Sequence, residues 1–260
     1  MIKISDELKA EVNHAITYRT DSSIYVLYHN YLPLNRSHGP DTKYPLPSYN
    51  YASGKTKMAA WFVTKCNSRS PRNAYAKELS RYIEVDIYGK CGTKYLPRSS
   101  AADCFKLLEK DYKFYLSFEN SLCPDYITEK VFRNAYFHNV IPIVMGASIE
   151  EYKRVSPPHS FIHVDQFESP AKLAEYLKYL DRNETAYNEY FAWHGHGVID
   201  GWTPKPQCVI CLFAHTADQL QPYSFLTFRS GGMMHVLIAC CGVILPINEV
   251  SPCTLVALQV

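Results

Sequence analysis

Polar residues that could bind a phosphorylated ligand lie between two apolar segments in the middle of the chain. The segments Phe114–Phe118 and Val140–Met145 have the composition of buried strands, and the apolar spacing between them predicts a helix. Tyr126, Glu129 and Lys130 are spaced i, i+3 and i+4, so they are expected on one face of that helix near its N-terminus. The sequence therefore predicts a polar cluster where the first strand ends.

A parallel sheet would make this cluster a candidate diphosphate site. Ligands of open parallel sheets bind beyond the carboxyl ends of the strands, where helix N-termini favour negative charge. Lys130 supplies a positive charge there, and Arg72 follows an earlier apolar strand closely enough to reach the same edge. The alternative is that Arg72, Glu129 and Lys130 are solvated helix residues and that Tyr126 is a packing aromatic. Spacing alone leaves both interpretations open.

Alternating strands and helices are expected to position the cluster. Apolar runs predict strands at Lys57–Asn67, Val85–Tyr88, Phe114–Phe118, Ile141–Met145 and Phe161–Val164. Helical spacing predicts helices at Pro71–Tyr82, Asp103–Leu108, Ile127–Phe137, Ile149–Val155 and Pro170–Leu180. This alternation predicts an α/β fold in which helices cover a Rossmann-like parallel sheet.

Composition limits the class of protein. The chain has 260 residues, of which 47% are apolar and 14% aromatic, enough for one sizeable core, alone or with a small second lobe. The formal net charge of +2 gives no basis for nucleic-acid binding. Residues 1–7 contain neither the apolar region of a signal peptide nor a membrane span of about 20 apolar residues. Taken literally, the sequence predicts a soluble chain with no evident anchor.

The sequence alone does not decide between the possible roles of the cysteines. Among nine cysteines, Cys208 and Cys211 form the only close pair of the CxxC type. A zinc site usually needs a second pair of ligands, for which His215 alone is weak support, and a redox site needs a thioredoxin-like setting that is not apparent. Asn35 and Asn183 begin glycosylation sequons, which agree with a secretory location.

The central segments Ser117–Asn120 and Asp125–Lys130 closely resemble the donor-site signature of the α1,3-fucosyltransferases, family 10 of the glycosyltransferases. The similarity extends in order through Thr17–Ser22, Asn67–Asn73, Val85–Gly89, Phe161–Asp165 and Cys208–Cys211. Two further segments, Pro142–Ala147 and Tyr190–Gly195, are more similar to the type that acts on the chitobiose core of N-glycans than to the Lewis-antigen type.

The resemblance implies a donor site for GDP-fucose. The family's pyrophosphate-binding arginine and lysine correspond to Arg72 and Lys130, and residues around the ribose, base and sugar correspond to Asn120, Tyr126 and Glu129. No Asp-x-Asp motif occurs in the chain, so no metal site and no required cofactor are expected, although divalent cations could still raise activity. Side chains and N–H groups would then stabilise the departing GDP.

The implied reaction is inverting transfer of L-fucose from GDP-fucose to the 3-hydroxyl of N-acetylglucosamine in glycoprotein glycans. The family's general base is a glutamate of the acceptor-side lobe, in a segment preceding the one that matches at Tyr18. Neither Glu7 nor Glu11 is assigned that role, so the catalytic base stays unknown. The alternative is a catalytically deficient isoform that lacks the acceptor lobe and binds GDP-fucose or a partner.

The resemblance also implies a two-lobed GT-B fold, of which this chain is the donor-side lobe with most of the acceptor-side lobe missing. Residues 1–50 are expected to be an acceptor-lobe remnant and interlobe connection, residues 51–215 the GDP-fucose-binding domain, and residues 216–260 a divergent, poorly ordered tail. Family members are anchored in the Golgi cisterna membrane, on its lumenal side, and act on N-glycans. There, Cys208 and Cys211 would form a disulfide.

Overall fold

The computed structural model describes residues 14–22, 24–94, 101–200 and 236–239. These belong to two compact units, His29–Asp200 and a unit comprising Met1–Tyr28 with Gly201–Val260. In the second unit, three short strands pair in parallel in the order β10-β1-β2, with bounds Val236–Ala239, His14–Thr17 and Ile24–Tyr25.

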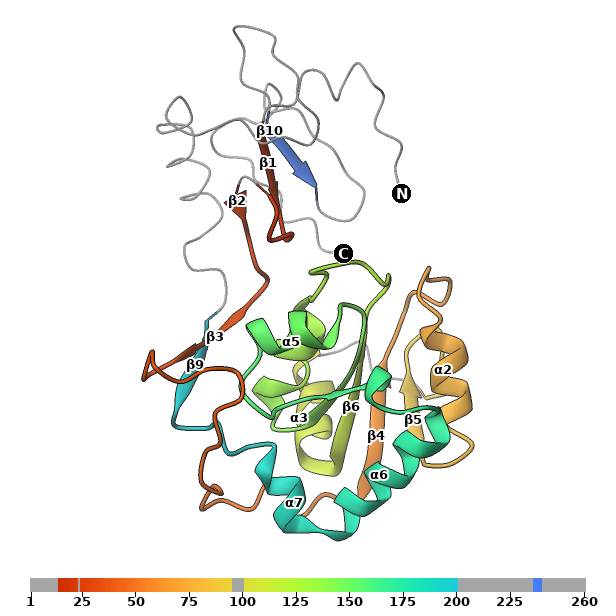
Figure 1. Ribbon diagram of the computed structural model, residues 1–260. Coiled ribbons are helices and arrows are strands. Elements are labelled where there is room, and N and C mark those ends of the chain that lie inside the picture. The colour runs from red at the N-terminus through yellow and green to blue at the C-terminus, as the bar shows by residue number, and fades with distance from the viewer. Residues whose placement is uncertain (1–13, 23, 95–100, 201–235, 240–260) are drawn as a thin grey trace, which may run out of the picture. The chain divides into compact units, whose positions relative to one another are not determined.

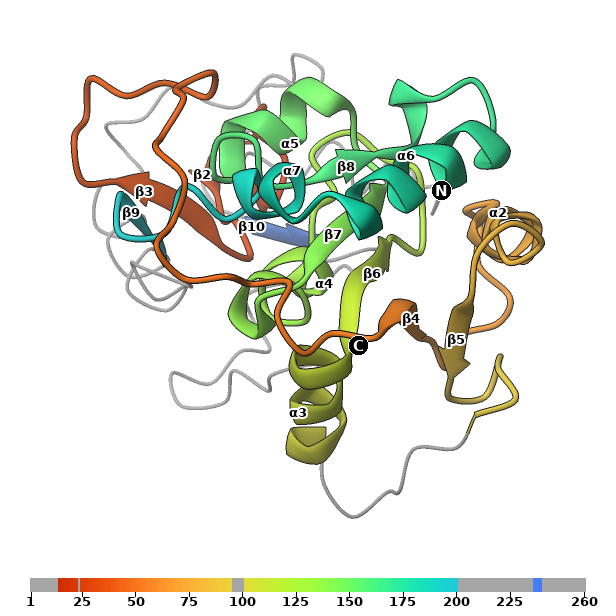
Figure 2. The same ribbon diagram turned by 90° about the horizontal axis from the view of Figure 1, so that it is seen from below.

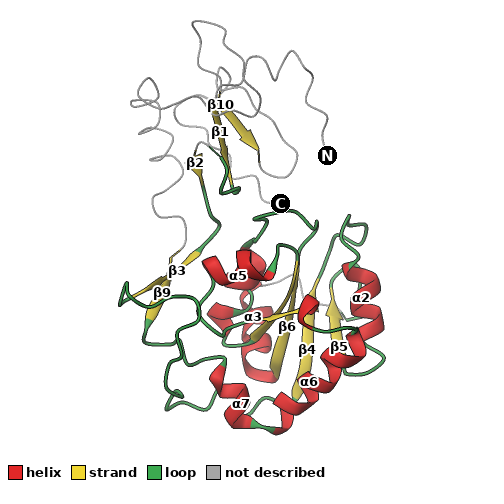
Figure 3. Cartoon of the chain, in the orientation of Figure 1, coloured by secondary structure: helices red, strands yellow, loops and turns green. Residues whose placement is uncertain are grey.

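The His29–Asp200 unit is built on a parallel sheet of five strands in the order β5-β4-β6-β7-β8. Strands β4, β5 and β6 are labelled in Figures 1 and 3, and strands β7 and β8 in Figure 2. The strands are β4 (Lys57–Phe62), β5 (Val85–Tyr88), β6 (Tyr112–Phe118), β7 (Ile141–Met145) and β8 (Ile162–His163). Strands β6 and β7 are buried at every position, as expected for a sheet covered on both faces. The predicted α/β fold and its five strands are confirmed, with β4 and β8 shorter than expected.

Helices cover both faces of this sheet (Figure 2). The main helices of the unit are α2 (Arg72–Leu79), α3 (Ala101–Asp111), α5 (Ile149–Val155), α6 (Pro170–Arg182) and α7 (Glu184–Glu189). One apolar cluster joins α2, α6 and α7 to residues such as Phe114, whereas a second joins α3 to residues such as Tyr115. Neighbouring residues of β6 thus face opposite helical layers, because side chains alternate along a strand.

The helix expected at Ile127–Phe137 is much shorter than predicted. Helix α4 spans only Glu129–Phe132 and is followed by the 3-10 turn η1 (Tyr136–His138). The backbone of Thr128 is extended, and its N–H donates to the buried Glu119 side chain instead of continuing a helix. Tyr126 therefore lies in the turn before α4, and its expected place on one helix face with Glu129 and Lys130 is wrong.

A two-stranded ribbon flanks the parallel sheet in the same unit. Strand β3 (Asn30–Pro33) pairs antiparallel with β9 (Gly197–Asp200). A Cβ atom on Gly197 would lie 2.3 Å from Cζ of Tyr31, so the buried Tyr31 ring requires glycine at this position. The ring also packs edge-on against Trp193, with centroids 6.0 Å apart.

A disulfide joins Cys66 to Cys91, a pairing that the sequence reasoning did not identify. Each cysteine follows a strand, Cys66 after β4 and Cys91 after β5, and these strands are neighbours in the sheet. Their Cα atoms are 5.3 Å apart, a normal separation for a disulfide. The position of each cysteine just beyond an apolar run was the available signal, but its use required knowing that β4 and β5 pair.

Removing this bridge is expected to destabilise the unit. The double variant Cys66→Ser/Cys91→Ser should lose about 3 kcal/mol of unfolding free energy, because the bond closes a loop with a sequence separation of 25. Urea unfolding of the oxidised chain measures this loss. Cys123→Ser is the control, since Cys123 carries a free, half-buried thiol and its replacement should change stability little. Equal stability of the double variant and the wild type would contradict a structural role for the bridge.

Several expectations concern residues that the structure does not describe. Cys208 and Cys211 lie outside the described residues, as does the tail 216–260 apart from β10. Within the described ranges, no helix is long and apolar enough to cross a membrane.

Candidate functional site

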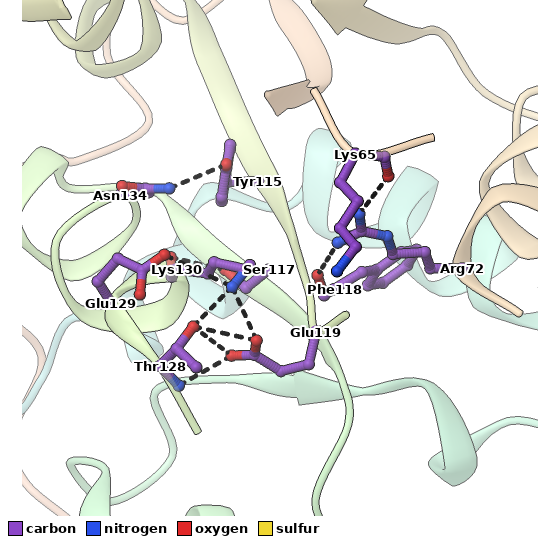
Figure 4. Close-up of polar contacts among 10 residues, drawn as sticks. All are labelled: Lys65, Arg72, Tyr115, Ser117, Phe118, Glu119, Thr128, Glu129, Lys130 and Asn134. Carbon is purple, nitrogen blue, oxygen red and sulfur yellow. Dashed lines mark hydrogen bonds and ion pairs between the residues drawn. The ribbon is translucent and has the colours of Figure 1, made fainter. Parts of the chain in front are cut away.

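A buried carboxylate, Glu119, lies at the carboxyl end of β6. Its side chain is 1% exposed and accepts hydrogen bonds from N and Oγ1 of Thr128, both at 2.8 Å. Nζ of Lys130 forms an ion pair with Glu119 Oε2 at 2.9 Å and donates to Thr128 Oγ1 at 2.7 Å (Figure 4). These three side chains form a closed network that fixes the segment entering α4.

Lys130 is held by both its main chain and its side chain. Its carbonyl oxygen accepts a hydrogen bond from Oγ of Ser117 at 3.1 Å, which ties α4 to the adjoining strand β6. The side chain is 17% exposed, and its third polar contact is a longer one, 3.5 Å to Oε1 of Glu129. The ammonium group is therefore held in a defined position by its neighbours.

Arg72 is the first residue of α2 and is 2% exposed. Its guanidinium donates to the carbonyl oxygens of Lys65 at 2.7 Å and Phe118 at 3.2 Å, and lies 5.6 Å from the centroid of the Trp61 ring. Nε is buried and has no hydrogen-bond partner among the described residues. Arg72 thus connects the loop after β4 to the end of β6, and the interpretation as a solvated helix residue is wrong.

Arg72 and Lys130 contact consecutive residues at one strand end. Arg72 contacts Phe118 and Lys130 contacts Glu119, so the structure brings both cations to the carboxyl end of β6 (Figure 4). This arrangement matches the expectation that they share one edge of the sheet. Both cations are thus fixed at the carboxyl end of β6, the edge at which open parallel sheets bind their ligands.

The other three predicted residues surround this strand end in different environments. Asn120 follows Glu119 directly, is half-buried, and its carbonyl oxygen accepts from N of Ser70 at 3.2 Å. Tyr126 is 3% exposed, so its ring packs within the protein, whereas the Glu129 side chain is 42% exposed. Their contacts with ribose, base and sugar stay predictions.

Glu119 is the site residue that sequence reasoning missed. It belongs to the motif Ser117–Asn120, and its place directly after a buried apolar strand was a signal, because an acid there is either solvated or paired. Burial raises the pKa of the Glu119 carboxyl, and the ion pair with Lys130 and the hydrogen bonds from Thr128 oppose that rise.

Gly146 provides the space that Glu119 occupies. A Cβ atom at Gly146 would lie 2.8 Å from Cγ and 3.0 Å from Cβ of Glu119, closer than ordinary packing allows. Gly146 does not have a positive φ, so only this contact makes glycine necessary.

Gly146→Ala is expected to displace Glu119 and to destabilise the fold by about 1–3 kcal/mol, the usual cost of overpacking. Binding at the strand end should weaken together with stability, since Lys130 depends on Glu119 for its position. Thermal unfolding and ligand titration would measure both. Gly39→Ala is the matched control, because no atom lies within 4 Å of the added methyl group and stability should not fall. Unchanged stability of Gly146→Ala would show that Glu119 can move without cost.

Comparison with known proteins identifies the family. The family described as "Glycosyltransferase family 10 (fucosyltransferase) C-term" matches residues 52–226 of this sequence. The chain belongs to glycosyltransferase family 10. The matched region contains the sheet, Arg72, Glu119 and Lys130.

Relatives of this family 10 chain include two fruit-fly proteins. Glycoprotein 3-alpha-L-fucosyltransferase A from Drosophila melanogaster is 46% identical over 213 residues, which cover 81% of this chain and 41% of the relative. Alpha-(1,3)-fucosyltransferase C from the same species is 38% identical over 222 residues, 81% of this chain and 51% of the relative. The chain thus spans about half or less of the length of each.

A solved structure shows the same fold. The crystal structure of an alpha1,3-fucosyltransferase with GDP is 24% identical to this family 10 chain, with a TM-score of 0.50. The match covers 65% of this chain and 49% of the solved one. At this identity the likeness establishes the shared fold.

The two sequons of the family 10 chain differ in environment. Asn35 is exposed, and its Oδ1 accepts from N and Oγ of Ser37. Asn183 instead caps α7 by accepting from N of Ala186, and its amide donates to the Tyr179 hydroxyl. In the described part of the chain, no group of three or more His, Cys, Asp and Glu side chains is placed to hold a metal ion.

Proposed function

We propose that this chain binds GDP-fucose at the carboxyl end of β6 and supplies the donor site for fucosyl transfer to glycoprotein glycans. The contacts of Arg72 with Phe118 and of Lys130 with Glu119 carry the proposal, because they fix two cations at the sheet edge where ligands bind and cations form strong hydrogen bonds to phosphate. The name of the fly relative describes a glycoprotein 3-alpha-L-fucosyltransferase. A fold neighbour with 22% identity and a TM-score of 0.50 was solved with GDP-fucose.

The reaction is inverting transfer of L-fucose to the 3-hydroxyl of N-acetylglucosamine. Breaking the sugar–phosphate bond leaves negative charge on GDP, and Arg72 and Lys130 stabilise that charge as fixed cations. The sugar carbon acquires oxocarbenium character, and the acceptor hydroxyl needs a general base. In the family that base is a glutamate of the acceptor-side lobe. No metal or other cofactor is required in this scheme, and divalent cations act only as stimulators.

Asn120, Tyr126 and Glu129 complete the donor site around ribose, base and sugar. Glu129 is the most exposed of the three and could hold a sugar or ribose hydroxyl. We assign the donor-binding domain to residues 51–215, a remnant of the acceptor-side lobe with the interlobe connection to 1–50, and the divergent tail to 216–260. The acceptor is an N-glycan of the chitobiose-core type, and the location is the lumenal side of the Golgi cisterna membrane. There Cys208 pairs with Cys211, and Asn35 and Asn183 are glycosylated.

Calorimetric titration of the oxidised chain tests the donor site. GDP-fucose should bind saturably, GDP-mannose more weakly because the sugar differs, and UDP-galactose not measurably. A chain with a cooperative thermal transition that binds none of them would overturn the proposal.

Transfer is tested separately, with a core N-glycan glycopeptide as acceptor and mass spectrometry to detect the added fucose. Binding with transfer supports the enzyme. Binding without transfer, also after the acceptor-side lobe of a relative is added, would identify a catalytically deficient GDP-fucose-binding protein instead.

A further inference from the structure

The Lys130 ammonium has no unused donor in the described structure. A lysine carries three N–H donors, and oxygens of Glu119, Thr128 and Glu129 lie 2.9, 2.7 and 3.5 Å from Nζ. A phosphate oxygen that binds Lys130 must therefore compete with a contact already made. The strongest competitor is the Glu119 carboxylate, because it is the buried ionic partner.

Loss of Lys130 as a partner would leave Glu119 with an uncompensated buried charge. A carboxylate in that position is strongly destabilised, and the usual response is to bind a proton. The two hydrogen bonds from Thr128 satisfy only part of its charge. The negative diphosphate nearby would favour the neutral carboxylic acid further.

We propose that Glu119 is the resident counter-ion of Lys130, releases it to the donor diphosphate, and takes up one proton from solvent in exchange. This inference rests on the proposed donor site. The carboxylate becomes a carboxylic acid, Lys130 stays an ammonium ion, and no bond of the nucleotide sugar is made or broken in this step. Glu119 is therefore a positioning residue for Lys130.

No second carboxyl is among the groups that face Glu119 in the described structure. Lys130 and Thr128 face it from the α4 segment, and the remaining neighbours that interact with its charge are Tyr115 on β6, Tyr152 on α5 and Arg72 on α2. Burial raises the pKa of both tyrosine hydroxyls far from neutrality. Arginine keeps its charge in proteins.

Tyr152 also provides an acceptor for the new carboxylic acid proton. Its hydroxyl is buried and has no hydrogen-bond partner among the described residues. A methyl group placed on Gly146 would lie 2.8 Å from Cγ of Glu119 and 3.3 Å from the Tyr152 hydroxyl, so both line the same small space. A protonated Glu119 could donate to this oxygen.

Proton uptake determines whether the affinity for GDP-fucose rises or falls with pH. A ligand that binds together with a proton binds more weakly as pH rises, by up to about tenfold per pH unit. GDP-fucose is the proper probe, because one of its phosphates is bonded to the ribose and the other to the fucose, and neither is a terminal phosphate. GDP carries a terminal phosphate that titrates near pH 6 and would obscure the effect.

The experiment is calorimetric titration of GDP-fucose into the full chain at pH 6.5, in several buffers of different ionisation enthalpy. The observed binding enthalpy should rise linearly with buffer ionisation enthalpy, with a slope between about 0.3 and 1 proton taken up. Glu119→Gln should still bind and give a slope near zero, and its affinity should be flat between pH 6 and 8. Thr128→Val keeps the side-chain shape but removes a donor to the carboxylate, so the pH of maximal uptake should shift upward.

The outcomes separate the two proposals. GDP-fucose binding by the wild type with zero slope, or a full slope retained in Glu119→Gln, would overturn the role of Glu119 and leave the donor site intact. A folded wild type that does not bind GDP-fucose would overturn both. If Glu119→Gln does not fold, the wild-type slope and the Thr128→Val shift decide, and a slope that Thr128→Val does not move would count against Glu119.

Discussion

Lys130→Met is expected to weaken GDP-fucose binding by at least about 30-fold, the effect of removing one partner from a buried charge pair. It should also destabilise the free chain by about 3 kcal/mol at pH 7, because Glu119 loses the cation that compensates its buried charge. Methionine keeps the length and apolar stem of lysine, so the change is mainly one of charge. Calorimetry and urea unfolding measure the two effects.

The loss of stability should depend on pH. Burial already raises the pKa of Glu119, and removal of Lys130 raises it further. A carboxyl with a raised pKa in the folded state favours folding at low pH and loses that contribution as pH rises through the folded value. Lys130→Met should therefore be closest to wild type near pH 5 and least stable near pH 8.

A double variant separates stability from binding. Glu119→Gln/Lys130→Met removes both charges, so it should regain most of the lost stability while GDP-fucose binding stays weak. Lys172→Met is the matched control, since this exposed lysine of α6 forms only a surface ion pair with Glu175. If the single variant Lys130→Met loses the same unfolding free energy at pH 5 and at pH 8, the charge of Glu119 is not the cause of that loss.

Arg72→Lys is expected to be nearly as damaging, although the charge is kept. The planar guanidinium reaches Lys65 O and Phe118 O together while facing Trp61, a geometry that one ammonium group cannot reproduce. At least one buried carbonyl would be left unpaired, at a cost of about 1–3 kcal/mol. GDP-fucose binding should fall by at least about 10-fold, which corresponds to 1.4 kcal/mol.

Arg69→Lys is the matched control for this variant. Arg69 is exposed and lies in the same loop between β4 and α2, so its replacement should change stability by no more than about 0.5 kcal/mol. Urea unfolding and calorimetry of both variants make the comparison. Equal behaviour of Arg72→Lys and Arg69→Lys would show that only charge, and not the fork of hydrogen bonds, matters at Arg72.

The elements could be predicted wherever a local pattern determines them. Strand β7 and helix α5 have the expected bounds, because an unbroken apolar run and regular helical spacing define them locally. The sequence also placed Arg72 and Lys130 at one sheet edge, since each follows a buried strand. Each of these predictions depends only on residues that are close to each other in the sequence.

Features that depend on long-range contacts could not be predicted in this way. The late start of α4 at Glu129 coincides with the bond between Thr128 and Glu119, and helical spacing carries no trace of that contact. The pairing of Cys66 with Cys91 depends on the order of strands in the sheet. The donor roles of all five predicted residues stay predictions, because they require contacts with a ligand; these residues are Arg72, Asn120, Tyr126, Glu129 and Lys130.

The Cys66–Cys91 bridge also determines what a protease could do to this protein. The segment between the two cysteines contains Arg72, all of α2 and strand β5. A single cut within that segment would leave both pieces joined through sulfur, and they would separate on a gel only after reduction. In an oxidising compartment, where such bonds persist, a nicked chain would thus retain the arginine of its proposed diphosphate site.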